Sequence, residues 1–136
     1  MKSLVLAAVF MAGLGSVASA ADTYKCDFSG AGTGNWVPDV FFIKVDAENN
    51  SAAIRDGRKQ GADKNGWRKA KIRRHTEKSV SVGWSIERMK SSTNQNVSMD
   101  YRVVIVKKTQ KANVMIEPRG YRNTFQGKGR CAVLKG

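Results

Sequence analysis

The sequence predicts an all-β domain of about eight short antiparallel strands, arranged as a meander that closes into a small barrel. The clearest strand is 79–89, where small or polar residues alternate with four apolar ones: Val80, Val82, Trp84 and Ile86. That two-residue period is typical of a half-buried strand, because successive side chains leave opposite faces. Similar segments recur between turn-forming residues, and the only two cysteines, Cys26 and Cys131, lie far apart in the chain. A sandwich of two sheets fits the same pattern and is the alternative fold.

The first twenty residues have the features of a cleaved signal peptide. Lys2 gives a positive start, residues 4–14 are mostly apolar, and Ala18-Ser19-Ala20 is a small-residue cleavage site. Cleavage there would leave residues 21–136 as a single all-β domain, which we expect to be secreted or periplasmic. No later apolar run is long enough for a transmembrane helix.

In an oxidising compartment, an even number of cysteines favours a disulfide, here between Cys26 and Cys131. It would close a loop of about 100 residues, which the chain-entropy model values at roughly 4–5 kcal/mol. Such a bridge places the first and last strands side by side and would pin the seam of a barrel.

Three strands are predicted in the first part of the domain, where apolar side chains alternate over 24–28, 41–46 and 52–56. A glycine-rich connection that carries Trp36 follows the first of them. Glu48-Asn49-Asn50 joins the other two as a hairpin, because Asn tolerates the left-handed backbone of tight turns. Residues 57–66 then form a polar loop.

The segment 67–78 is ambiguous. Ala70 and Ile72 fit one face of a strand, whereas Trp67, Ala70 and Arg74 fit one face of a helix. We favour a strand, because the neighbouring segments are strands and residues 73–76 offer little apolar stripe.

Three more strands complete the meander after the strand at 79–89. A polar turn at 91–96 leads to 99–105, which again alternates, and a turn at 109–111 leads to Val114 and Ile116. Pro118 ends that strand, since proline lacks the donor that a sheet ladder requires. The last strand is predicted at 124–134, where it can meet the first one and close the barrel.

No motif predicts catalysis or metal binding. His75 is the only histidine and stands among cations, and the Gly-x-Ser-x-Gly motif of hydrolases is missing. The carboxylates that might act in pairs are interpreted as salt-bridge partners; they are Asp39, Asp56, Glu87, Asp100 and Glu117. We therefore expect no enzyme, no cofactor and no metal.

The strongest functional signal is the basic segment 55–78, which holds ten Lys or Arg against three acids in a chain of formal net charge +13. An aromatic ring among cations can stack on a sugar or base while the cations neutralise phosphate or carboxylate. The predicted anion-binding residues are Arg58, Lys59, Lys64, Trp67, Arg68, Lys69, Lys71, Arg73 and Arg74. Their expected partner is a lipid head group, an acidic polysaccharide or extracellular nucleic acid. The alternative is a solvated basic surface with Trp67 in the core.

Two other functions stay open, and the oligomeric state is open as well. Gly34-Asn35-Trp36 resembles the Gly-x-Trp signature of lipocalins, which implies an eight-stranded carrier with a small apolar ligand inside. Five residues are expected to fill much of that interior: Phe28, Phe41, Ile43, Trp84 and Tyr101. The two far-apart cysteines on a small exported barrel also resemble the periplasmic lysozyme inhibitors of the membrane-bound C-type class, which implies an inhibitor.

Overall fold

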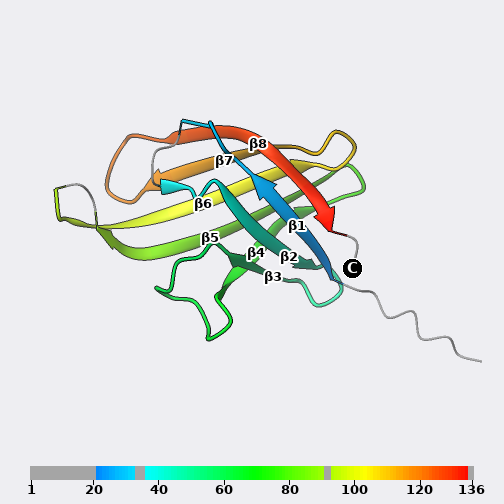
Figure 1. Ribbon diagram of the computed structural model, residues 1–136, viewed down its shortest axis with the longest axis horizontal. Coiled ribbons are helices and arrows are strands. Elements are labelled where there is room, and N and C mark those ends of the chain that lie inside the picture. The colour runs from blue at the N-terminus through cyan, green and yellow to red at the C-terminus, as the bar shows by residue number, and fades with distance from the viewer. Residues whose placement is uncertain (1–20, 33–35, 91–92, 135–136) are drawn as a thin grey trace, which may run out of the picture.

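The protein is a closed barrel of eight antiparallel strands joined in sequence order (Figure 1). The structure, a computed structural model, describes residues 21–32, 36–90 and 93–134. The predicted all-β class and barrel closure are confirmed. The strands are β1 (Asp22–Asp27), β2 (Val40–Asp46), β3 (Ser51–Arg55), β4 (Trp67–His75), β5 (Ser79–Lys90), β6 (Asn96–Val106), β7 (Lys111–Pro118) and β8 (Phe125–Leu134).

The seam between β1 and β8 is closed by the predicted disulfide. Cys26 lies directly opposite Cys131 in the antiparallel ladder, and the two sulfurs are bonded. Gly129 on β8 has no side chain at the point where Phe28 packs: a Cβ there would lie 2.6 Å from Phe28 Cδ1. The seam is therefore held by a covalent bond and by close packing.

The ambiguous segment is a strand. β4 pairs with β3 on one side and with β5 on the other, and a β-bulge shifts its register between Ile72 and Arg74. Ala70 and Ile72 pack against the core, as expected for one face of a strand. In Figure 1 the long β5–β6 hairpin reaches beyond the other strands.

Two predictions fall on residues that the structure does not describe. The proposed signal peptide, residues 1–20, lies outside the described part, and so do Gly34 and Asn35 of the lipocalin-like tripeptide. Within the described ranges, no helix has the length and apolar character needed to cross a membrane.

The interior is packed around a chain of aromatic rings, which confirms the predicted core. Phe28 stacks on Phe41, Phe41 contacts Trp84 at a tilt, and Trp84 stacks on Tyr101, with ring centroids 5.4, 5.9 and 5.2 Å apart. All four side chains are buried, and so is Ile43. Stacked and tilted pairs at these distances add stability beyond their buried area.

Candidate anion-binding groove on the outer face of β4

Strand alternation divides the basic residues of β4 between two faces of the sheet. Arg68 is buried, in phase with the core-facing Ala70, whereas Trp67, Lys69 and Lys71 have the opposite phase and face outward. The outward face of β4 therefore presents a row of cations next to an aromatic ring.

The β-bulge extends this row by two arginines. Arg73 lies beside Gly83, whose added Cβ would be 3.0 Å from Arg73 Nε. Arg74 pairs with Ser81, which faces outward because it stands between the core residues Val80 and Val82. A bulge redirects side chains in this way, and here it turns consecutive arginines to the same face.

A groove of about 780 Å³ runs along this outer face, across β4 to β7; we call it the outer groove. It exists because the outward residues of β5 are small, Ser81, Gly83 and Ser85, while the neighbouring strands carry long side chains. Gly83 and Ser85 form its floor. Its walls carry Lys69, Lys71 and Arg73 on β4, Asp100 and Arg102 on β6, Met115 and Glu117 on β7, and Arg119 just beyond β7.

A second hollow of about 520 Å³ adjoins the outer groove and shares Lys69 and Ser85 with it. Trp67 lines this second hollow. The Asp63 carboxylate fixes the turn before β4 by accepting the backbone N–H of Trp67 at 3.0 Å. Lys44 Nζ lies 4.4 Å from the centre of the Trp67 ring, in a cation–π contact that occupies one side of the indole.

The far wall of the outer groove is held by an ion-pair network. Arg119 bridges Asp100 Oδ1 at 2.9 Å and Glu87 Oε1 at 3.0 Å, and Ser85 Oγ donates to Asp100 Oδ1 at 2.6 Å. Hydrogen bonds from Arg119, then from Ser85, hold the pKa of Asp100 below its usual 3.8. The hydrogen bond from Ser98, together with Arg119, lowers the pKa of Glu87. Both carboxylates are therefore ionised at neutral pH.

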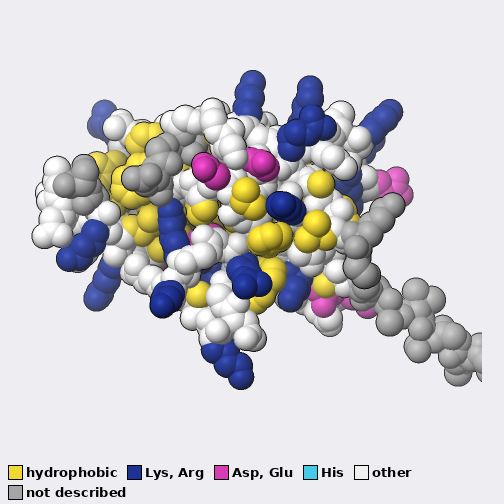
Figure 2. Space-filling model, in the orientation of Figure 1, with side chains coloured by type: hydrophobic (Ala, Val, Ile, Leu, Met, Phe, Trp, Pro, Cys, Tyr) yellow, Lys and Arg dark blue, Asp and Glu magenta, His cyan; other side chains and the backbone are white. Residues whose placement is uncertain are grey.

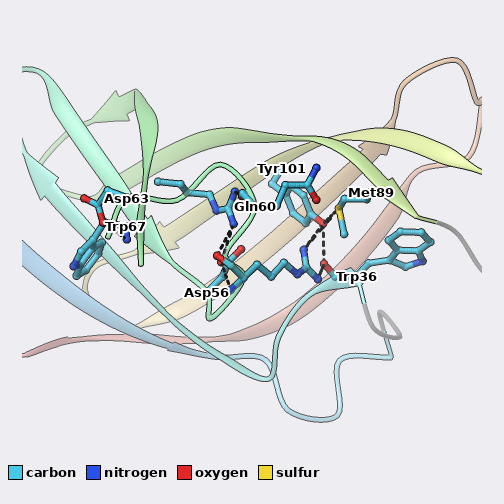
Figure 3. Close-up of polar contacts among 9 residues, drawn as sticks. Trp36, Asp56, Gln60, Asp63, Trp67, Met89 and Tyr101 are labelled. Atoms are coloured by element: carbon cyan, nitrogen blue, oxygen red, sulfur yellow. Dashed lines mark hydrogen bonds and ion pairs between the residues drawn. The ribbon is translucent and has the colours of Figure 1, made fainter. Parts of the chain in front are cut away.

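Two of the predicted binding residues are held by contacts within the barrel: Arg68 is buried, and Arg58 is half-buried. Arg68 Nη2 pairs with Asp56 Oδ1 at 3.2 Å, and both side chains are almost fully buried, with exposed fractions of 4% and 3%. Arg58 donates to Tyr101 Oη at 3.0 Å and to the Trp36 carbonyl at 2.8 Å. Figure 3 shows Trp36, Met89 and Tyr101 gathered in this cluster, with Trp67 lying apart from it.

The remaining predicted cations are exposed. Lys59 and Lys64 lie on the loop between β3 and β4, and neither is among the residues that line the two hollows. His75 is exposed at the end of β4. Figure 2 shows Lys and Arg side chains projecting around much of the outline of the face it draws. The structure thus brings Trp67, Lys69, Lys71 and Arg73 together and separates them from Arg58, Lys59 and Lys64. Arg68 contributes to the lining of the second hollow but is buried and paired, and Arg74 extends the row beyond the residues that line the outer groove.

The residues that complete the outer groove had weaker signals in the sequence. Asp100 and Glu117 were candidate carboxylates, but their position beside the basic row depends on the register of β6 and β7. One signal in the sequence could have predicted the groove. Gly83 is the middle one of three small residues, Ser81, Gly83 and Ser85, that share the outward face of a strand.

A smaller apolar hollow of about 190 Å³ lies at one end of the barrel. Its apolar lining comes from the ends of strands and from loops: Trp36, Val97, Met99, Pro118, Tyr121 and Phe125.

In the described part of the chain, no three His, Cys, Asp or Glu residues come together as metal ligands would. No protein-family model, curated protein or solved structure matches this chain.

Proposed function

We propose that this protein is an exported, non-enzymatic binding module that holds an anionic partner in the outer groove. The observation that carries the proposal is the row Lys69, Lys71 and Arg73 along one wall of a concave surface. Among the described residues, ion pairs engage Arg68 and Arg119 but none of these three cations. Their charge is therefore available to a ligand.

Binding would use the exchange of counterions. Lys and Arg release the counterions of a polyanion when they neutralise its charged groups, so affinity falls steeply as salt rises. The high net positive charge of the chain attracts such a partner from a distance, and the groove supplies the contact surface.

The test reverses charge inside and outside the groove. In one variant Lys69, Lys71 and Arg73 become Glu; in the matched control Lys108, Lys111 and Lys128, which are exposed on other strands and turns, become Glu. Both triple variants change the net charge equally. On a heparin column we expect the groove variant to elute at much lower salt than the control. Equal losses would contradict a groove and indicate a diffuse basic surface.

The apolar hollow at the barrel end supports a second candidate, a carrier of a small apolar molecule. Its lining of Trp36, Val97, Met99 and Phe125 is chemically suited to such a ligand. This function predicts binding of an apolar fluorescent dye that does not depend on salt and is weakened by Val97→Asp. Dye fluorescence unaffected by that substitution would exclude it.

A further inference from the structure

We infer that the ligand of the outer groove is a single chain of an acidic polysaccharide in which carboxylate-bearing sugars expose hydroxyl groups between their charges. This inference rests on the proposed function and specifies its partner. It follows from the shape of the groove, from the chemistry of its two walls and from its lack of stacking surfaces.

The shape favours a chain over a membrane. The floor at Gly83 and Ser85 lies below walls of long side chains, so a flat layer of lipid head groups could contact only the rims. Gly83 keeps the floor low because it lacks a side chain, and the side chain of Arg73 packs over it, with Nε 3.0 Å from the position that a Cβ would take. An extended polymer chain can enter such a groove and contact both walls at once.

The two walls differ in charge. Lys69, Lys71 and Arg73 form a cationic wall, whereas the opposite wall combines two carboxylates, Asp100 and Glu117, with two arginines, Arg102 and Arg119, so its formal charges balance. Asp100 already accepts hydrogen bonds from Arg119 and Ser85, and Glu117 lies directly opposite it across β6 and β7. A wall of balanced charge attracts an anion less than the cationic wall does, and the Glu117 carboxylate can accept hydrogen bonds from hydroxyl groups. A chain with carboxylates along one edge and hydroxyls along the other is complementary to both walls.

Nucleic acid fits the groove less well. Proteins that bind single strands stack successive bases on exposed aromatic rings. In the described part of the two hollows, Trp67 is the one aromatic side chain that is not buried, and Lys44 already occupies one side of its ring. Trp84 and Tyr101 also contribute atoms to the lining, but their rings are buried and stacked on each other.

The experiment compares three ligands, and it tests the shape of the groove with one substitution that places an uncharged side chain on the floor. Calorimetry or fluorescence anisotropy measures binding of an oligogalacturonate, an oligothymidylate of similar charge, and phosphatidylglycerol vesicles. Gly83→Leu fills the floor and pushes the Arg73 side chain aside without changing the net charge. Asn113→Leu adds the same side chain at an exposed outward position of β7 that does not line the groove. We expect Gly83→Leu to weaken oligogalacturonate binding by about tenfold or more, and Asn113→Leu to leave it unchanged.

Circular dichroism and the melting temperature show whether Gly83→Leu is folded. A second variant keeps the inference testable if it is not. Glu117→Lys removes a hydrogen-bond acceptor from the wall opposite β4 and should reverse the preference, weakening the binding of oligogalacturonate relative to that of oligothymidylate. Tighter binding of oligothymidylate by the natural protein, or vesicle binding that ignores Gly83→Leu, would overturn this inference but leave the anion-binding proposal standing. If none of the three probes binds, the proposed function fails as well.

Discussion

Arg68 and Lys69 are neighbours in sequence but face opposite sides of the barrel wall, so their substitution should have opposite effects. In Arg68→Met the interior loses a guanidinium that donates to Asp56 at 3.2 Å and to the Gln60 and Arg58 carbonyls at 2.7 and 3.2 Å. Breaking a buried ion pair from one side costs about 3–5 kcal/mol. Asp56 keeps one backbone donor, the N–H of Arg58 at 3.0 Å, so we expect a loss near the lower value, about 3 kcal/mol.

Lys69→Met removes an exposed charge from the groove wall. Surface substitutions usually change stability by no more than about 0.5 kcal/mol, so its unfolding should match that of the natural protein. Its affinity for a polyanion should fall, and the slope of log affinity against log salt should decrease by about one. Arg68→Met, measured under conditions in which it is folded, should keep the affinity and the salt slope of the natural protein.

Urea unfolding followed by tryptophan fluorescence gives the stabilities, and binding titrations at several salt concentrations give the slopes. The reasoning is refuted if Arg68→Met is as stable as Lys69→Met, or if Arg68→Met loses affinity while Lys69→Met keeps it. Either result would mean that the guanidinium of Arg68 reaches the ligand and not Asp56.

Three other predictions test the seam and the far wall of the groove. Cys131→Ser should lower the free energy of unfolding by about 4–5 kcal/mol, because it opens a loop of 105 residues; a change below about 1 kcal/mol in urea would contradict this. Gly129→Ala should cost about 1–3 kcal/mol or more, because its Cβ would overlap the Asp27 carbonyl and the Phe28 ring; an unchanged melting temperature would show that β8 can move. Since the pKa of Asp100 lies below 3.8 in the fold, its ionisation stabilises the protein above that pH, and this contribution is lost as pH falls through the folded pKa. NMR titration should find the Asp100 pKa raised in Arg119→Ala, and an unchanged pKa would exclude the bridge.

The barrel could be predicted from the sequence because its determinants are local or covalent. Alternation is visible within a single segment such as 79–89, and turn residues separate one strand from the next. The pairing of Cys26 with Cys131 needs only a count of cysteines and an oxidising compartment. Even the ambiguous segment 67–78 could be assigned, because strands surround it.

The division of the basic segment could not be predicted in the same way. Arg68 carries the same charge as Lys69 and Lys71. Its phase with Ala70 and Ile72 places it on the core-facing side of the strand, but the partner that lets a charged side chain stay buried there is Asp56, twelve residues earlier, which no local pattern reveals. The bulge that turns Arg73 and Arg74 outward has no glycine to mark it. The position of Asp100 and Glu117 beside Arg119 depends on the registers of three strands, which are set by long-range packing and not by any local pattern.

The most direct test of a ligand groove on the outer face of β4 is an NMR titration of the ¹⁵N-labelled protein with oligogalacturonate. We predict that the amide signals that shift most belong to Lys69, Lys71 and Arg73 on β4 and to Gly83 and Ser85 on β5. Shifts that gather instead around Val97 and Phe125 at the barrel end, or that spread evenly over all exposed lysines, would contradict it.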